Sequence, residues 1–450
     1  MTIAAAERTT VGAFPWLTPR CCVAILALAA LVCCAAFVPA FAYAAVVATC
    51  ALAGFFAADI AIGPRRDDVT VTREPLGHLA LRRPATLRYV VENRGRAAVY
   101  FGIIDTPVPE LQFLDGQVSG WLPPSRRTVE SMEVLPVERG LAELGTLYVR
   151  GENNIGLLRR RWAFPGACRT RVFPDLSAVE RYGRLARHGR LMEAGFRKLR
   201  LRGGGGEFES LREWTPDDSF RSIDWKATAR RVKLMVASYD VERSQNVMLV
   251  LDAGRLMMPR IGSQRKFDYA LTAALSVATL AAGTDDRVGL TAFASAIVEH
   301  VAPRSGAGHA SALVRRLYDL QPRFEEADYA GAFTFLQRVQ RKRSLVVFFT
   351  DMFDPIASST VLANAGLLAK RHLVMCVLLN DEAIDAALDQ TPQSPRQAYR
   401  AGVAAALATE RSRAAAVLAQ RGIMVLDVPA SRLTVSLINS YVDVKSRGLL

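Results

Sequence analysis

The strongest constraint on the fold is an almost uncharged run near the amino terminus. Residues 21–62 read CCVAILALAALVCCAAFVPAFAYAAVVATCALAGFFAADIAI, and Asp59 is the only charged residue among them. A helix needs about 20 apolar residues to cross a bilayer. The run therefore predicts a transmembrane helical hairpin over residues 21–62, with its turn near Pro39. The alternative is a buried helical hairpin in a soluble fold, which the length of the run disfavours.

The charges that flank this run predict its orientation. Arg8 and Arg20 precede it, Arg65 and Arg66 follow it, and the turn between the helices carries no charge. Positively charged flanks stay on the cytoplasmic side of a membrane. We therefore expect a multi-pass protein of the inner membrane, with residues 1–20 as a cytoplasmic tail and the soluble domains in the cytoplasm.

The rest of the chain divides into three regions by pattern. Residues 67–175 alternate apolar and polar positions between Pro, Gly and Asn, which predicts an all-β sandwich domain. Residues 245–450 alternate buried-strand runs such as VMLVLDAG with helical segments, which predicts a doubly wound α/β domain with a parallel sheet. Residues 176–244 join them as a basic helix, a glycine hinge at 203–206 and a charged segment.

Positive charge is concentrated in the joining region. The chain has a net charge of +14, and residues 176–202 hold eight Lys and Arg against two Glu. A basic helix beside a membrane segment predicts contact with anionic lipid headgroups. Nucleic acid attracts the same charge, but the sequence has no zinc finger and no aromatic-interleaved basic motif. We therefore expect no nucleic-acid partner.

Two predicted strands end in aspartate, Asp252 after VMLVL and Asp351 after VVFFT. Ligands of open parallel sheets bind beyond the carboxyl ends of the strands. If these strands are neighbours, both carboxylates face one crevice, and such oxygen ligands suit Mg²⁺. The alternative is that both aspartates cap helices and accept hydrogen bonds from loop amides.

Other catalytic motifs are missing from the sequence. The glycine run GGGG lacks the following Lys-Ser/Thr of a phosphate-binding loop, and neither G-x-S-x-G nor H-E-x-x-H occurs. The five histidines share no metal-ligand spacing. We therefore expect no catalytic residues and no enzymatic activity.

The stretch GGGGEFESLREWTPDDSFRSIDWKATAR, residues 203–230, places aromatic residues among many charges. Tryptophan favours burial and buried charges need partners, so we predict a structural brace. In it the tryptophans pack against the α/β domain and the charged residues form an ion-pair network. A docking surface and a solvated run of charges are the alternatives. The candidate residues are Arg212, Trp214, Asp218, Arg221, Asp224, Trp225, Lys226 and Arg230.

Two stretches of this segment carry a family resemblance. LREW at 211–214 and DSFRSIDWKATAR at 218–230 resemble the signature of the bacterial domain of unknown function fifty-eight family, and residues 245–450 resemble a von Willebrand factor A-type domain. The resemblance implies a membrane-anchored, non-enzymatic interaction protein. Its expected partners are a MoxR-type AAA+ ATPase and other membrane proteins. Together with the ATPase, such a protein helps to assemble or activate other proteins.

The A-type resemblance also implies where a metal would bind. Such domains hold Mg²⁺ with an Asp-x-Ser-x-Ser loop, a threonine and a last aspartate. Asp252 and Asp351 fit the two aspartates, but Gly254 and Leu256 stand at the serine positions and Ala327 stands near the threonine position. We therefore expect weak or absent Mg²⁺ binding. The alternative function is a metal-dependent hydrolase that uses the Asp252/Asp351 crevice.

Neighbouring acids could substitute for the missing metal ligands. The candidates are Glu325, Glu326, Asp328 and Asp354.

Overall fold

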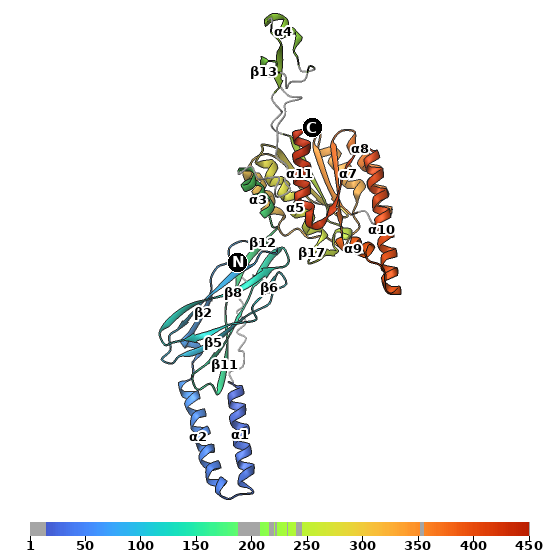
Figure 1. Ribbon diagram of the computed structural model, residues 1–450. Coiled ribbons are helices and arrows are strands. Elements are labelled where there is room, and N and C mark those ends of the chain that lie inside the picture. The colour runs from blue at the N-terminus through green and yellow to red at the C-terminus, as the bar shows by residue number, and fades with distance from the viewer. Residues whose placement is uncertain are drawn as a thin grey trace. The chain divides into compact units, whose positions relative to one another are not determined.

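A computed structural model of the protein describes most of the chain. The described residues are 15–187, 208–215, 220, 223–231, 233–239, 245–351 and 355–449. The chain divides into two compact units between Phe173 and Pro174, and Figure 1 shows the elements of each. The glycine hinge at 203–206 lies outside the described residues.

Two apolar helices open the first unit, α1 (Pro19–Ala35) and α2 (Ala40–Ile62). Thr18 caps α1, its side chain accepting a hydrogen bond from the Cys21 amide at 3.3 Å, and Pro19 suits the first helical position. In the described part of the chain, one helical stretch, Phe41–Ile62, is long and apolar enough to cross a membrane. Helix α1 has 17 residues, which is shorter than the predicted span.

The β-rich part of the first unit contains three sheets with one common core. They have the strand orders β2-β4-β8-β6, β1-β11-β10-β5-β7 and β3-β12-β9. Alternate residues of β4, among them Leu87, Tyr89 and Val91, are buried and pack with Phe101 and Val149 from the second sheet. The predicted alternation of apolar and polar positions is therefore present. The strands are β1 (Trp16–Leu17), β2 (Val69–Arg73), β3 (Leu79–Ala80), β4 (Ala85–Asn93), β5 (Val99–Asp105), β6 (Leu111–Phe113), β7 (Val118–Leu122), β8 (Arg126–Pro136), β9 (Gly140–Leu144), β10 (Leu147–Glu152), β11 (Leu158–Phe164) and β12 (Cys168–Phe173).

Hydrogen bonds join the apolar helices to this β-rich part. Asp59 in α2 is fully buried, and its Oδ2 accepts hydrogen bonds from the amides of Leu157 at 2.8 Å and Leu158 at 3.0 Å. The Thr18 hydroxyl donates to the carbonyl oxygen of Gly156 at 2.6 Å. Asp59, the single charged residue of the apolar run, thus binds the backbone at the start of β11.

The second unit contains a six-stranded sheet with the order β19-β18-β15-β20-β21-β22. All neighbouring strands are parallel except the edge pair β18 and β19, so the predicted parallel sheet is confirmed. The strands are β15 (Asn246–Asp252), β18 (Arg287–Phe293), β19 (Ile297–Arg304), β20 (Leu345–Thr350), β21 (Leu373–Asn380) and β22 (Met424–Pro429).

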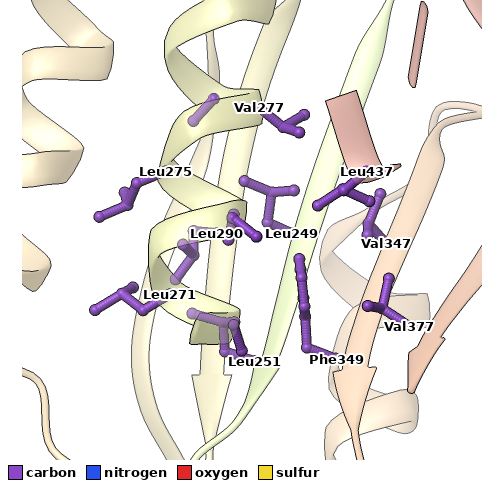
Figure 2. Close-up of a cluster of buried hydrophobic side chains, with 14 of the residues drawn as sticks. Leu249, Leu251, Leu271, Leu275, Val277, Leu290, Val347, Phe349, Val377 and Leu437 are labelled. Carbon is purple, nitrogen blue, oxygen red and sulfur yellow. The ribbon is translucent and has the colours of Figure 1, made fainter. Parts of the chain in front are cut away.

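Helices cover both faces of this sheet. Leu249 and Leu251 of β15 pack with residues of α5 (Lys266–Ala282) and α11 (Leu433–Ser446), as Figure 2 shows for Leu271 and Leu437. Val250 faces the other way, into a cluster formed with helices α7 (Tyr329–Val339), α8 (Pro355–Ala369) and α10 (Pro395–Gln420). Burial on both faces explains the continuous apolar runs of the central strands.

The second unit also contains α3 (Ser177–Arg187), α6 (Ala307–Leu317) and α9 (Glu382–Asp389). Helix α3 is the described part of the predicted basic helix, and its Tyr182 is buried in the cluster around β15. One face of α3 therefore packs on the α/β core.

His372, between α8 and β21, makes stability depend on pH. The side chain is buried, and neither ring nitrogen has a hydrogen-bond partner in the described part of the chain. Burial, with a smaller contribution from Arg371, lowers the pKa of His372. The unfolded chain then binds the proton first as the pH falls below about 6.5, so the folded state loses stability towards acid.

We expect the free energy of unfolding of the wild-type chain to fall between pH 7 and pH 5, with a smaller fall in His372→Leu. Urea unfolding at both pH values measures this difference. His78 is exposed, so the matched control His78→Leu should keep the wild-type pH dependence. Equal pH dependence in His372→Leu and wild type would contradict the assignment.

Candidate functional site

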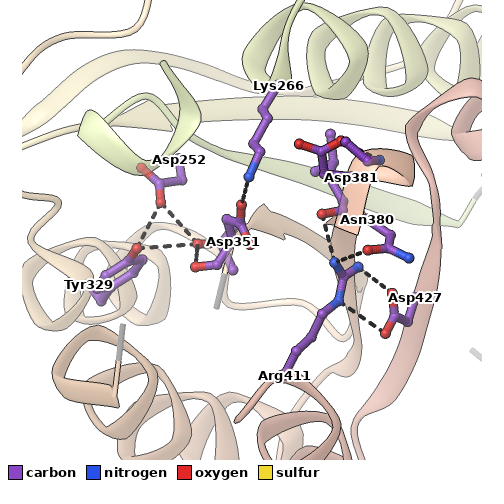
Figure 3. Close-up of polar contacts among 11 residues, drawn as sticks. Asp252, Lys266, Tyr329, Asp351, Asn380, Asp381, Arg411 and Asp427 are labelled. Atoms are coloured by element: carbon purple, nitrogen blue, oxygen red, sulfur yellow. Dashed lines mark hydrogen bonds and ion pairs between the residues drawn. The ribbon is translucent and has the colours of Figure 1, made fainter. Parts of the chain in front are cut away.

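The candidate site lies at the carboxyl edge of the sheet, where Asp252 ends β15 and Asp351 follows β20. These strands are parallel neighbours, with Leu251 opposite Phe349, so the condition for a shared crevice is met. The Thr350 hydroxyl donates to Asp252 Oδ2 at 2.9 Å. Thr350 directly precedes Asp351 in the chain, so this hydrogen bond brings the Asp252 carboxylate near Asp351. Figure 3 shows the two aspartates close together.

Asp252 is fully buried and accepts three hydrogen bonds. Its Oδ1 accepts from the Gly254 amide at 2.8 Å. Its Oδ2 accepts from Thr350 and from the Tyr329 hydroxyl at 2.8 Å. Burial raises the pKa of Asp252, and these hydrogen bonds oppose the rise. The hydrogen bond from a loop amide that the alternative predicted is therefore present at Asp252, and Tyr329 is a partner that the sequence did not indicate.

Asp351 forms a buried ion pair with Lys266, the first residue of α5. The Lys266 ammonium donates to Asp351 Oδ2, and both side chains are almost completely shielded from solvent. A buried carboxylate needs a compensating charge, and in this site a side chain of the same chain supplies it. The sequence did not indicate Lys266 as a partner, because 85 positions separate it from Asp351.

These residues do not fit a divalent cation. Gly254 and Leu256 supply no hydroxyl groups, and a Cβ at Gly254 would come within 3.0 Å of the Ala327 Cβ, so a serine there would be crowded. Tyr329 and Lys266 already bind the two carboxylates. Among the described residues, no cluster of three or more His, Cys, Asp or Glu could hold a metal ion.

The acids that could substitute as ligands have other roles. Glu325 accepts a hydrogen bond from Ser295 at 2.6 Å, and Glu326 pairs with Arg255. Asp328 caps α7 by accepting from the Gly331 amide at 2.9 Å. Asp354 lies outside the described residues.

A second buried polar group near this edge was not predicted. Arg411 of α10 donates to the Leu379 carbonyl oxygen at 3.0 Å, to Asn380 Oδ1 at 2.9 Å and to Asp427 Oδ2 at 3.1 Å (Figure 3). Arg411 lies on the same helix face as the buried residues Ala404 and Leu418. This spacing was the sequence signal that its side chain is buried. A charged residue on the apolar face of a helix indicates a buried partner.

The signature segment forms a small structure of its own, which we call the signature ribbon. It consists of β13 (Phe208–Glu213), the short helix α4 (Trp225–Arg231) and β14 (Met235–Tyr239), with β13 and β14 antiparallel. Asp224 caps α4 by accepting hydrogen bonds from the amides of Lys226 at 2.9 Å and Ala227 at 3.0 Å.

The two tryptophans of the ribbon differ in burial. Trp214 is partly buried and its ring lies 5.7 Å from that of Phe220. Trp225 exposes 62% of its surface and Phe220 exposes 67%. The prediction that both tryptophans are buried is therefore wrong for Trp225.

The described ion pairs of the ribbon include none of Asp224, Lys226 and Arg230, three members of the predicted network. The pair that is present joins Lys233 to Glu213 at 2.7 Å on the surface, and Lys226 and Arg230 are exposed. Asp218, Arg221 and the side chain of Arg212 lie outside the described residues. The proposed brace network therefore stays a prediction for those three residues.

Comparisons with known proteins find a family of unknown function and uncharacterized relatives. Residues 210–414 match the family described as "Protein of unknown function DUF58". An uncharacterized protein of Mycobacterium tuberculosis, Rv1480, is 27% identical over 181 residues, which are 40% of this chain and 56% of that protein. The chain thus spans about half the length of the curated relatives it matches first. The uncharacterized protein YeaD of Bacillus subtilis is 42% identical over 43 residues, which are 10% of this chain and 11% of that protein.

A solved structure, the ASH / PapD-like domain of human CEP192, gives a TM-score of 0.19 at 11% identity. It covers 24% of this chain and 87% of that chain. This score is too low to indicate a shared fold.

Proposed function

We propose that the protein is a membrane-anchored, non-enzymatic adaptor that acts with a MoxR-type AAA+ ATPase to assemble or activate other proteins, including membrane proteins. The apolar hairpin would hold it in the inner membrane as a multi-pass protein, with its soluble domains in the cytoplasm. The observation that carries the proposal is the exposed aromatic surface of the signature ribbon.

In the described part of the ribbon segment, the large exposed apolar side chains are those of Phe220, Trp225 and Leu234. Aromatic side chains are enriched at protein interfaces, and tryptophan is common among the residues that dominate binding energy. The exposed Lys226 and Arg230 belong to the same ribbon and would favour an acidic partner surface. This combination supports a docking surface over a solvated run of charges.

The apolar helices support attachment to a membrane. Phe41–Ile62 has the length and composition of a spanning helix, and α1 is the second, shorter span in this proposal. Arg181 and Arg184 lie on α3, and we propose that they contact anionic lipid headgroups.

We also propose a β-sandwich for the β-rich part and a von Willebrand A-like domain for residues 245–450, whose sheet carries one antiparallel edge strand.

The closed carboxylate pair supports an adaptor over the alternative hydrolase. A metal-dependent hydrolase needs carboxylates that can reach a metal and a water molecule. Asp252 and Asp351 are buried, and hydroxyl, amide and ammonium groups of the same chain bind them. We therefore assign no catalytic step to this pair.

Replacing Trp225 by Ala should weaken binding of the ATPase without loss of folding. Removal of a central aromatic residue from an interface costs about 2 kcal/mol or more, which corresponds to an affinity loss of about 30-fold. A binding titration of the purified ATPase against the full chain in lipid nanodiscs measures the loss. The melting temperature of the chain should not change, because the Trp225 side chain is exposed.

The matched control is Trp121→Ala in β7, which removes an aromatic side chain of 52% exposure from the other unit. We expect this variant to bind as the wild type does. If Trp225→Ala also binds normally, or if it loses its folded structure, the ribbon is not the docking surface.

A further inference from the structure

A cavity of about 440 Å³ lies in the first unit where α2 ends, and positive charge lines it. Its walls come from two turns, residues 63–68 after α2 and residues 93–97 between β4 and β5. The charged residues of its lining are three arginines and one acid: Arg65, Arg94, Arg96 and Asp68. Positive charge therefore exceeds negative charge at this end of the apolar hairpin.

Hydrogen bonds hold these two turns in position. Asn93 is fully buried, and its Nδ2 donates to the Ala97 carbonyl oxygen at 2.9 Å while its Oδ1 accepts from the Gly95 amide at 2.9 Å. The Arg94 amide donates to the Asp68 carbonyl oxygen at 2.6 Å. A Cβ at Gly95 would come within 3.0 Å of the Asp68 Cβ, so the two turns are in close contact. The arginines of both turns therefore surround one cavity.

Two of the three arginines lack an acidic partner. Arg94 pairs with Glu92 at 3.0 Å, and the Asp68 carboxylate accepts a hydrogen bond from the Arg65 amide at 2.9 Å. In the part of the chain that the structure describes, no ion pair includes the exposed side chains of Arg65 and Arg96. A guanidinium group binds phosphate oxygens through two parallel hydrogen bonds. Arg65 and Arg96 beside one cavity therefore fit a phosphate group.

The carboxyl end of α2 does not oppose such a ligand. The partial negative charge of a helix carboxyl end would repel a phosphate. Arg160 offsets it by donating to the carbonyl oxygens of Asp59 at 3.3 Å and Ile60 at 3.2 Å. A Cβ at Gly63 would overlap the Arg160 guanidinium, so glycine lets Arg160 reach the helix end. The arginines of the cavity are thus left for an anion from outside the chain.

Apolar surface adjoins these arginines. Ile62, the last residue of α2, lines the same cavity and exposes 56% of its surface. Phe55, two helical turns earlier and so on the same face, exposes 58%. Phe41–Ile62 is long and apolar enough to cross a membrane, and the end of a spanning helix lies at the depth of the lipid headgroups. A phospholipid would satisfy both the arginines and the apolar face, whereas a soluble phosphate would satisfy only the arginines.

We propose that this cavity binds one anionic phospholipid, with its phosphate on Arg65 and Arg96 and an acyl chain along Ile62 and Phe55. The surplus of positive charge disfavours headgroups that carry a cation of their own, such as choline. Basic pockets at the ends of membrane helices bind anionic headgroups in this way. The inference rests on the proposed membrane attachment, but not on the ATPase or on α3.

Native mass spectrometry of the full chain in detergent tests the site. The chain is titrated with phosphatidylglycerol and with phosphatidylcholine of the same acyl chains. The wild type should bind one phosphatidylglycerol at least about tenfold more tightly than phosphatidylcholine. Arg65→Gln/Arg96→Gln should lose this preference and keep the wild-type melting temperature, because both side chains are exposed. An unchanged preference in this variant would overturn the proposal.

Arg82→Gln/Arg88→Gln is the matched control. It removes the same charge from two exposed arginines of the first unit that do not line the cavity, and it should bind lipid as the wild type does. An equal loss in both double variants would overturn the site, since any surface arginine would then act alike. Displacement of the lipid by millimolar glycerol phosphate at constant ionic strength would assign the cavity to a soluble phosphate instead.

Flotation with phosphatidylcholine vesicles separates this inference from the proposed attachment. A chain that reconstitutes and floats but shows no preference for phosphatidylglycerol contradicts the site alone. A chain that floats with no vesicles contradicts the membrane attachment, and the lipid site with it.

Discussion

Asp286→Asn should lower the free energy of unfolding of the second unit by about 3–5 kcal/mol, the usual cost of removing one partner of a buried ion pair. The Asp286 side chain is fully buried and accepts hydrogen bonds from the Tyr441 hydroxyl and, at 2.9 Å, from the Gln245 amide. It also pairs with Lys445 of α11. The substitution leaves the Lys445 ammonium buried without its counter-charge, so the contact of the last helix with the sheet should weaken.

The adjacent residue gives a matched control. Asp285 is exposed and has φ of 62°, a conformation that Asn tolerates. Asp285→Asn makes the same chemical change and should alter stability by less than about 0.5 kcal/mol. Urea unfolding, followed by hydrogen exchange of α11, measures both variants.

Removal of the lysine as well should recover part of the loss. The double variant Asp286→Asn/Lys445→Met removes both charges of this buried pair, so we expect a coupling energy of about 1–3 kcal/mol between the two sites. Strict additivity, or an effect of Asp286→Asn as small as that of Asp285→Asn, would contradict the role of this pair.

Asp59→Ala should release the apolar hairpin from the β-rich part of the chain. The substitution leaves the amides of Leu157 and Leu158 without their acceptor, and each buried unsatisfied group costs about 1–3 kcal/mol. We therefore expect a loss of about 2–6 kcal/mol for this contact. Hydrogen exchange of the peptide over residues 153–160, in detergent, reports the loss directly as faster exchange.

Two variants control for the loss of charge at Asp59. Asp59→Asn keeps an oxygen that can accept from both amides, so it should exchange more slowly than Asp59→Ala. Asp67→Ala removes a nearby exposed acid and should exchange as the wild type does. If Asp59→Ala leaves the exchange of residues 153–160 unchanged, Asp59 does not hold the loop.

Much of the second unit could be predicted because its strands are buried on both faces. Continuous apolar runs fixed the positions of β15 and β20, and their terminal aspartates indicated the crevice edge. The partners in the crevice could not be predicted in the same way. Lys266 and Tyr329 lie at the starts of helices, 85 and 77 positions away from the acids that they bind. Only the packing of α5 and α7 brings them there.

The wrong prediction for Trp225 and the missed partners of Arg411 have a common physical origin. The apolar character of Trp225 indicates a need for contact but does not say whether the contact lies within the chain or in a partner. Its 62% exposure is compatible with the second possibility. The Ala-rich sequence of α10 is typical of a helix, but the partners of Arg411 come from β21 and β22, which local sequence does not place beside it.

The central claim is that the chain is a membrane-anchored adaptor that docks an ATPase through the signature ribbon. The most direct measurement is affinity purification of the tagged full chain from its native membranes, with quantitative mass spectrometry of the wild type and of Phe220→Ala/Trp225→Ala. We expect a MoxR-type ATPase to co-purify with the wild type and to fall by at least about tenfold with the variant. Equal recovery with both, or metal-dependent hydrolysis by the purified chain alone, would contradict the account.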